Sequence, residues 1–273
     1  MTPLLGKIAL VTGGGGGIGR ATCLALARAG CEVAVVDMNG DDAERVAGEI
    51  AQLGRRASAH RVDVRYRDRV AQLRDEVLAE YGRCDILVNN AGVVTAGLFQ
   101  NETHDDVRWV IETNVWGAIH LTQAFLPILL AAGEGHIVNL SSMVGLVGMP
   151  YNTTYALTKG AIRSFSEALR SEVITSGVGV TVVFPGSIRT NITQAARGTH
   201  ADQLAAMGRH RLAQRFLLDP EVVAHRIVRG VQRNRARVVV GPDARLLDLL
   251  SRAFPGRSGF VGRLASRWVR TQH

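Results

Sequence analysis

The chain has 273 residues, of which 47% are apolar and 21% charged, a composition typical of a globular protein rather than a disordered or fibrous one. We find no apolar run near the roughly 20 residues that cross a bilayer, no signal peptide and no metal-ligand spacing among the three cysteines, so we expect a cytoplasmic protein with reduced thiols and no metal. The net charge of +8 belongs to the C-terminal quarter, because residues 209–273 hold 14 Arg and 4 acidic residues.

Short β-branched segments alternate with helical patterns along most of the chain. Strands are predicted at residues 7–13, 32–37, 57–64, 85–92, 135–142, 178–186 and 236–241, and helices at 18–30, 41–54, 67–82, 103–132 and 154–176. Strands made almost wholly of Val, Ile and Leu, each followed by a helix, are typical of a parallel sheet with helices on both faces. We therefore predict a single α/β domain over residues 1–242, with a doubly wound parallel sheet of about seven strands.

Five consecutive glycines at residues 13–17 connect the first strand to the first helix. At that position backbone N–H groups and a helix N-terminus can face a pyrophosphate, and glycine permits its close approach. Asp37 ends the second strand 18 residues after Gly19, close to the spacing of about 20 expected for an acid that binds the adenosine ribose. The alternatives are a flexible connecting loop and a strand-end cap.

The same region indicates which dinucleotide is bound. A carboxylate at Asp37 accepts hydrogen bonds from ribose hydroxyls and repels a 2′-phosphate. Neither the glycine run nor the three residues after Asp37 supply an Arg or Lys. Arg20 is the one nearby cation that could soften the preference against a 2′-phosphate, unless it simply lies on the first turn of the helix. We therefore predict NAD as the cofactor, with NADP the less favoured alternative.

Tyr155 and Lys159 lie four residues apart on a predicted helix and so share one face. A nearby ammonium favours the phenolate and lowers the pKa of a phenol, which suits proton transfer to or from an alcohol or ketone oxygen. The chain has only 2 Lys against 30 Arg, which suggests that position 159 requires a compact ammonium. Taken alone, such a pair is also common on a solvated helix face.

Six motifs in order resemble those of the short-chain dehydrogenase/reductase family. They are TGGGGGIG at 12–19, NNAG at 89–92, Asn114 within ETNVWG, GHIVNLSS ending at Ser142, YALTK at 155–159 and PGSIRT at 185–190. The resemblance covers residues 7–190 and implies a single Rossmann-type domain that transfers a hydride between a nicotinamide and a secondary alcohol or ketone. It implies that Tyr155 is the general acid/base and that Lys159 lowers its pKa and holds the nicotinamide ribose. Ser142 would stabilise the reacting oxygen, and Asn114 would kink the long helix and position a water in the proton relay.

The resemblance also implies contacts along the whole cofactor. The Asp63-Val64 pair resembles the adenine clamp, and Asn90 and Gly92 line the adenosine side. Ile188 and Thr190 resemble the residues that contact the carboxamide. The full set of expected cofactor residues is Gly13, Gly17, Ile18, Gly19, Asp37, Asp63, Val64, Asn90, Ala91, Gly92, Tyr155, Lys159, Pro185, Gly186, Ile188 and Thr190.

The substrate is the least specified part of the site. Residues 191–217 occupy the segment that closes over substrate in this family. The predicted pocket wall consists of Val93, Val94, Ser142, Leu146, Val147, Met149, Tyr151 and Tyr155. Its apolar character favours a bulky apolar alcohol or ketone, although such a stretch is as easily ordinary core. His210 and Arg211 are candidates to meet an acidic group on the substrate, or are simply solvated.

Residues 243–273 form a basic amphipathic extension. Apolar residues repeat at helical spacing from Leu246 to Phe254 and again from Phe260 to Trp268, with Arg between them. The extension is interpreted as a lid or as part of a homodimer or homotetramer interface, with attachment to an anionic membrane as the alternative. Nucleic-acid binding is not expected, because a basic charge count alone is weak evidence.

Together these patterns predict an NAD-dependent oxidoreductase that interconverts a secondary alcohol and a ketone. Two alternatives stay open: an NADP-dependent carbonyl or 3-oxoacyl reductase, and a dinucleotide-binding regulatory protein that acts through its Arg-rich tail.

Overall fold

The parallel sheet predicted from the sequence is the centre of the computed structural model, which describes residues 3–202, 217–255 and 259. Its strands lie in the order β3-β2-β1-β4-β5-β6-β7, and every neighbouring pair is parallel. Their bounds are β1 Ile8–Thr12, β2 Glu32–Asp37, β3 Ala57–Arg61, β4 Ile86–Asn89, β5 Gly135–Leu140, β6 Val178–Pro185 and β7 Arg237–Val240. The order reverses between β1 and β4, which opens a crevice at the carboxyl ends of the strands.

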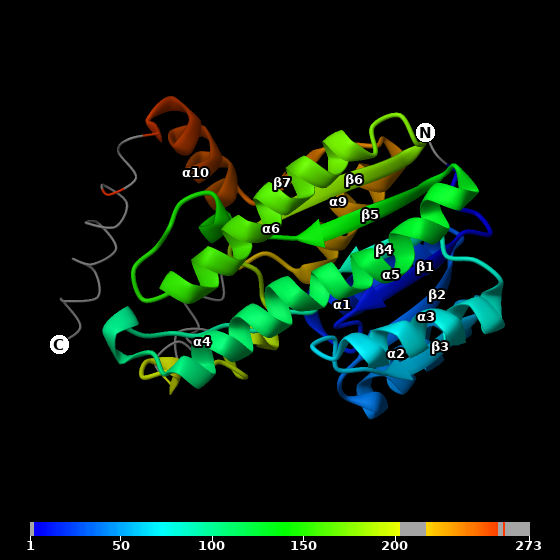
Figure 1. Cartoon of the computed structure of the whole chain (residues 1–273), viewed down its shortest axis with the longest axis horizontal. Helices are drawn as coiled ribbons and strands as arrows, with labels where there is room; N and C mark the ends of the chain where they lie inside the picture. Colours follow the sequence, from blue (N-terminus) through cyan, green and yellow to red (C-terminus); the bar gives the residue numbers. More distant parts are fainter. Residues whose placement is uncertain (1–2, 203–216, 256–258, 260–273) are drawn as a thin grey trace.

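Helices cover both faces of this sheet (Figure 1). One face packs against α1 (Gly17–Arg28), α2 (Gly40–Gln52) and α9 (Pro220–Gln232). The other packs against α3 (Arg67–Tyr81), α5 (Gly117–Ala132) and α6 (Thr153–Glu172). Alternate residues of a strand belong to opposite cores, as Val11 and Leu10 of β1 do, because side chains alternate across a strand. The predicted α/β, doubly wound class is confirmed.

The long helical region predicted at 103–132 is interrupted near its middle. It consists of α4 (His104–Ile111), a π-helical turn at Glu112–Trp116 and α5. Within the turn, the Gly117 N–H donates to the Glu112 carbonyl five residues back. Asn114 lies inside this turn and is buried, so the expected distortion of the helix at Asn114 is present. Such turns are frequent at functional sites.

This region also corrects the sequence-based expectation about apolar runs. Within the described residues, His104–Ala132 is long enough to cross a bilayer and contains an 18-residue window apolar enough to do so, with a mean hydropathy of 1.6. Its α5 part lies along β4, β5 and α3 and contributes Leu121, Phe125 and Leu129 to the core. Core helices of globular domains pass the same test of length and composition, so this run is weak evidence for a membrane span.

Several shorter elements complete the described chain. The described residues include three 3₁₀ turns, η1 Phe99–Asn101, η3 Met143–Gly145 and η4 Asn191–Thr193. The extension begins with helix α10 (Pro242–Ala253), which packs near β7 and η3. Helix α9 was missed by the sequence analysis. The second predicted amphipathic repeat, Phe260 to Trp268, and both His210 and Arg211 lie outside the described residues.

Candidate active site

A cavity of about 580 Å³ occupies the crevice at the carboxyl ends of the strands. Its size is within the range of small-molecule and cofactor sites. The walls come from the loops that follow β1 to β6, from helices α2, α4 and α6 and from the π-helical turn. Residues on these walls include Gly13, Gly15, Gly16, Gly17, Ile18, Asp37, Asp63, Val64, Asn90, Ala91, Gly92, Ser142, Tyr155, Lys159, Pro185, Gly186, Ile188 and Thr190. All predicted cofactor residues except Gly19 therefore line one cavity.

The glycine loop forms a wall of bare backbone. Gly13 and Gly17 have φ of +62° and +50°, a region that favours glycine. A Cβ placed on Gly19 would overlap the carbonyl oxygen of Gly13, so Gly19 acts by letting the loop fold closely on the start of α1. The Gly14 N–H donates to the Val36 carbonyl at 3.0 Å, which fixes the loop against β2. This cradle at a helix N-terminus fits the pyrophosphate of a dinucleotide.

Asp37 presents its carboxylate beside this loop. Its Oδ2 accepts from the Gly15 N–H at 2.9 Å, and its Oδ1 accepts from the Asn39 N–H at 3.0 Å. Each oxygen keeps a further lone pair for a ribose hydroxyl. Asp63 stands on the same end of the cavity and is paired with Arg65 at 2.6 Å. Burial opposes ionisation of Asp63, but the bonds from Arg65 outweigh it and lower the pKa of the carboxyl.

Two cations at this end were missed by the sequence analysis. Arg45 of α2 and Arg65 both line the cavity, whereas Arg20 is not among the lining residues and instead pairs with Glu49 of α2. The expectation that Arg20 is the one nearby cation is therefore wrong. Arg45 was missed because it lies 30 residues from Gly15 in the sequence and comes beside the glycine loop only when α2 packs there.

The NNAG segment plays a different part from the one expected. The Nδ2 of Asn90 donates to the carbonyls of Thr12 at 2.8 Å and Gly13 at 3.2 Å, so its amide ties the glycine loop to the end of β4. A Cβ on Gly92 would lie 3.2 Å from the Asn114 Oδ1 and 3.4 Å from the Lys159 Nζ. Gly92 therefore lies beside Asn114 and Lys159, not on the adenosine side.

The end of the cavity lined by Ser142, Tyr155 and Lys159, the predicted catalytic end, lies between the end of β5 and helix α6. Lys159 is buried, and its Nζ donates to the Leu140 carbonyl at 2.9 Å and lies 5.6 Å from the centre of the Tyr155 ring. Ser142 follows β5 in an extended conformation, its hydroxyl accepts from the Val144 N–H at 3.4 Å, and it lines the same cavity as Tyr155. The structure thus brings together the three residues expected to surround a reacting oxygen.

The protonation states correct one expectation. Burial raises the pKa of Tyr155 to about 12, and the neighbouring Ser142 hydroxyl offsets only part of that rise. Burial also lowers the pKa of Lys159 to about 8. Without a bound cofactor the ammonium does not lower the pKa of the phenol, because removal from water disfavours both charged forms.

The side chain of Asn114 connects the loop after β4 to helix α6. Its Oδ1 accepts from the Val93 N–H at 2.8 Å, while its Nδ2 donates to the Val93 carbonyl at 2.9 Å and the Thr158 hydroxyl at 3.1 Å. The side chain therefore holds the loop after β4 against α6. The role of Asn114 in a water-mediated relay stays a prediction.

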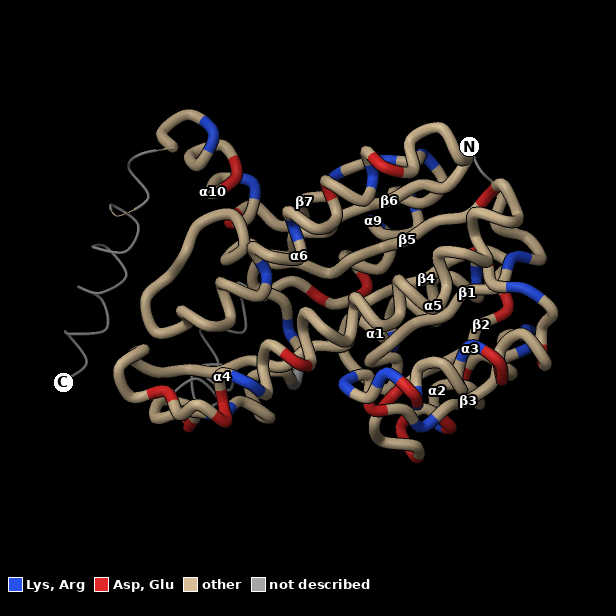
Figure 2. The backbone as a smooth tube through the Cα atoms, in the orientation of Figure 1, with Lys and Arg blue, Asp and Glu red and all other residues tan. Residues whose placement is uncertain are grey.

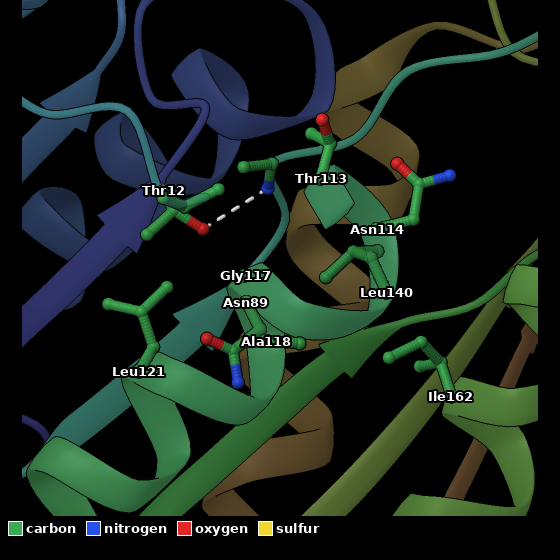
Figure 3. Close-up of a pocket in the computed structure, with 11 residues that line it drawn as sticks. Thr12, Asn89, Thr113, Asn114, Gly117, Ala118, Leu121, Leu140 and Ile162 are labelled. Carbon is green, nitrogen blue, oxygen red and sulfur yellow. Dashed lines mark hydrogen bonds between the residues drawn. The ribbon is translucent and has the colours of Figure 1, made fainter. Parts of the chain in front are cut away.

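A second, small cavity lies behind the catalytic end, between β4 and the π-helical turn (Figure 3). The Thr12 hydroxyl accepts from the Ala91 N–H at 3.1 Å along one of its walls (Figure 3). Asn89 lines it as well, and within the described residues its Oδ1 is one of two buried side-chain polar atoms that lack a hydrogen-bond partner. Thr12 and Asn89 therefore give this small cavity polar lining in addition to Asn114.

The predicted substrate wall is only partly correct. Val93, Ser142 and Tyr155 line the large cavity, but Val94, Leu146, Val147, Met149 and Tyr151 do not. Val94 and Val147 are 5% and 4% exposed and belong to the core. Neighbouring side chains of an extended segment point to opposite sides, so Val93 and Val94 cannot both face the cavity. Ile192 and Ala195, from the segment 191–217 predicted to close over substrate, also line the cavity, and the apolar residue that was missed is Trp109.

Comparison with known proteins agrees with this geometry. The family model for short chain dehydrogenase matches residues 7–201. The chain belongs to the short-chain dehydrogenase family. This short-chain dehydrogenase is 37% identical over 257 residues to SadH of Mycobacterium tuberculosis, with 92% of each chain covered.

Solved structures of the family bind either dinucleotide. A short-chain dehydrogenase/reductase from Burkholderia phymatum in complex with NAD has a TM-score of 0.84 and 29% identity, and the match covers 93% of this chain and 95% of that one. A metagenomic short-chain oxidoreductase in complex with NADP has a TM-score of 0.73 and 28% identity, with 88% and 99% covered. Family membership therefore indicates a nicotinamide dinucleotide and leaves the choice between the two to the residues of the site.

Proposed function

We propose that this short-chain dehydrogenase uses NAD to interconvert a secondary alcohol and a ketone, and that its substrate is bulky and apolar. One observation carries the proposal: Ser142, Tyr155 and Lys159 meet at one end of a cavity whose other end is the glycine loop and Asp37. A binding protein without catalysis has no need for a buried lysine beside a tyrosine in the same cavity.

The residues divide the chemistry between them. When bound, the nicotinamide supplies or accepts the hydride at the substrate carbon. Tyr155 gives or takes the proton at the substrate oxygen, and the Ser142 hydroxyl hydrogen-bonds the same oxygen as its charge develops. Because burial raises the pKa of Tyr155 to about 12, the phenolate forms readily only when additional positive charge comes near. The Lys159 ammonium, one turn away on the same helix face, does not offset the effect of burial by itself. A bound oxidised nicotinamide would bring further positive charge beside Tyr155.

The preference for NAD is supported by the charges at the adenosine end. Asp37 and Asp42 both line the cavity there, and carboxylates repel a 2′-phosphate. The two cations at this end are already paired, Arg45 with Asp42 and Arg65 with Asp63. A 2′-phosphate would have to break one of these pairs to gain a cation.

The proposal of an apolar substrate is supported by the mostly apolar side chains that line another part of the cavity. Val93, Trp109, Ile192 and Ala195 line it together with the polar Thr113. A mostly apolar wall that leads to a few convergent polar groups suits a hydrophobic molecule with one reacting oxygen.

Exposed apolar residues support a further proposal, assembly into a homodimer or homotetramer. Trp116, Leu130 and Leu157 are 50%, 41% and 58% exposed, and all three lie in the π-turn, α5 or α6. On α10, Leu246 and Leu249 are 58% and 64% exposed. Light scattering on the full chain tests the proposal, and a monomer at micromolar concentration would contradict it.

The alternative for α10 and the rest of the extension is peripheral attachment to an anionic membrane. Co-sedimentation with anionic liposomes, with and without residues 243–273, separates the two. Equal partitioning of both chains would exclude attachment through the extension.

The function itself is tested by a fluorescence screen for NADH. The full chain is incubated with NAD⁺ and a panel of apolar secondary alcohols, with short-chain alcohols and primary alcohols as comparisons. We expect NADH to form with a bulky apolar secondary alcohol. NADPH formed from NADP⁺ at an equal or higher rate would contradict the choice of cofactor, and activity confined to small polar alcohols would contradict the substrate class.

A further inference from the structure

Arg45 reaches from α2 to the backbone of the glycine loop. Its Nη2 donates to the Gly15 carbonyl at 2.7 Å and to the Asp42 Oδ1 at 2.9 Å, and its Nη1 donates to the Glu49 Oε1 at 2.9 Å. Acidic and basic residues gather around α2 and α3 (Figure 2). Arg45 differs from an ordinary surface ion-pair residue because one of its acceptors is a carbonyl of the cofactor loop.

Gly15 is held from both of its sides. Its N–H donates to the Asp37 Oδ2 at 2.9 Å, while its carbonyl accepts from Arg45. The space around it is full, because a Cβ at Gly15 would lie 2.6 Å from the Asp42 Cβ. The same contacts that fix Gly15 therefore also set the position of the Asp37 carboxylate against the loop.

The network continues to the first helix. The carboxylate of Glu49 accepts from Arg45 and also from Arg20 of α1, whose Nη2 lies 2.5 Å from the Glu49 Oε2. The start of α1, the glycine loop and α2 are thus connected through Arg45 and Glu49. A guanidinium suits this position because its planar fork can serve several acceptors at fixed angles, which an ammonium cannot.

The connection through Arg45 matters because the loop it holds consists of five glycines. Glycine loses more conformational freedom on folding than any other residue, so an unanchored run of five would have to be ordered when the cofactor binds. A loop that is ordered beforehand spares that cost and binds more tightly. Arg45 supplies a side-chain anchor near the middle of the run, where the glycines have no side chains of their own.

We propose that Arg45 is a positioning residue that orders the glycine loop for NAD, and that it does not serve as a binding cation for a 2′-phosphate. The inference rests on the proposed use of NAD. The guanidinium of Arg45 is occupied by the Gly15 carbonyl, by Asp42 and by Glu49, which it shares with Arg20, so its charge is already paired with carboxylates. The opposing possibility is that Arg45 leaves these partners to bind the phosphate of NADP.

Titration calorimetry of the full chain with NAD⁺ and NADP⁺ separates the two roles. For Arg45→Ala we expect the Kd for NAD⁺ to rise roughly fivefold, as for the loss of a partly exposed charge-assisted hydrogen bond. The KM for NAD⁺ should rise equally while kcat at saturating NAD⁺ stays unchanged. Arg45→Lys should recover only part of the affinity. Arg163→Ala is the matched control, because Arg163 pairs with Glu167 four residues on, as Arg45 does with Glu49.

A second measurement needs no cofactor. Amide hydrogen exchange at Gly15 and Gly16 in the cofactor-free chain should become several-fold faster in Arg45→Ala and stay unchanged in Arg163→Ala. Unchanged exchange together with an unchanged Kd for NAD⁺ would overturn the proposal, as would a larger loss of affinity for NADP⁺ than for NAD⁺. If the parent protein binds both dinucleotides equally, the choice of NAD fails, while the exchange rates still decide whether Arg45 orders the loop.

Discussion

The buried Lys159 makes a prediction about stability that is independent of catalysis. Its side chain is 4% exposed, and within the described residues its hydrogen-bond partner is the Leu140 carbonyl and no carboxylate pairs with it. Burial lowers the pKa of the ammonium from 10.5 to about 8. Below pH 8 the native state therefore bears the full cost of the buried charge, about 3 kcal/mol. Between pH 8 and 10.5 the unfolded state binds more protons than the native state, so stability rises with pH.

Substitution of Lys159 by Met removes this titration and keeps a side chain of similar length. The common effects of pH on the two proteins cancel when their free energies of unfolding are subtracted. From the two pKa values, the parent protein should gain about 2 kcal/mol relative to Lys159→Met between pH 7 and pH 9.5. The lost hydrogen bond to Leu140 shifts the difference by a similar amount at both pH values, because a neutral amine still donates.

Urea unfolding at the two pH values measures this difference. Arg163→Met on the same helix is the control, because a guanidinium does not titrate in this range and its difference from the parent should not change with pH. A pH-independent difference for Lys159→Met would refute the reasoning, since Lys159 would then hold its proton as an exposed lysine does. If the parent protein instead lost stability relative to the variant as the pH rises, a partner would be raising the pKa of Lys159 in the native state above its value in the unfolded state.

The other predictions concern the cofactor and the substrate. In Asp37→Ala the ratio of the Kd values for NADP⁺ and NAD⁺ should fall about tenfold by calorimetry, because the carboxylate that repels the 2′-phosphate is gone; an unchanged ratio would show that Asp37 does not discriminate. Gly19→Ala should abolish NAD⁺ binding, since its Cβ meets the Gly13 carbonyl, whereas Gly48→Ala in α2 has open space away from the cavity and should bind NAD⁺ normally; equal affinities of the two variants for NAD⁺ would contradict the cradle. Trp109→Ala should raise the KM for an apolar alcohol several-fold and leave the Kd for NAD⁺ unchanged, and the reverse pattern would remove Trp109 from the substrate wall.

The sheet and the cofactor cradle were predictable because their signals are local. A run such as IALVT is buried on both faces of a parallel sheet whatever surrounds it, and the glycine pattern fixes a turn of the backbone within eight residues. Helix α9 had a local signal as well. Pro220 opens it, and Val223, Ala224, Ile227, Val228 and Val231 repeat at helical spacing on its buried face.

The residues that were misplaced depend on tertiary packing. Arg45 lies 30 residues from Gly15, and only the docking of α2 brings the two together. The choice between Val93 and Val94 follows from the register of an extended segment, which composition does not report. The pairing with Lys159 predicted a lowered pKa for Tyr155, but the pKa is raised, because burial acts on both groups and outweighs their pairing.

The central claim is that Tyr155 exchanges a proton with the substrate in an NAD-dependent reaction. Tyr155→Phe keeps the ring and removes only the hydroxyl, so steady-state turnover of the best alcohol and calorimetric binding of NAD⁺ test it together. We predict that turnover falls roughly a thousandfold while the Kd for NAD⁺ changes less than about twofold. Turnover within a few-fold of the parent protein would contradict the account, because another group would then be moving the proton.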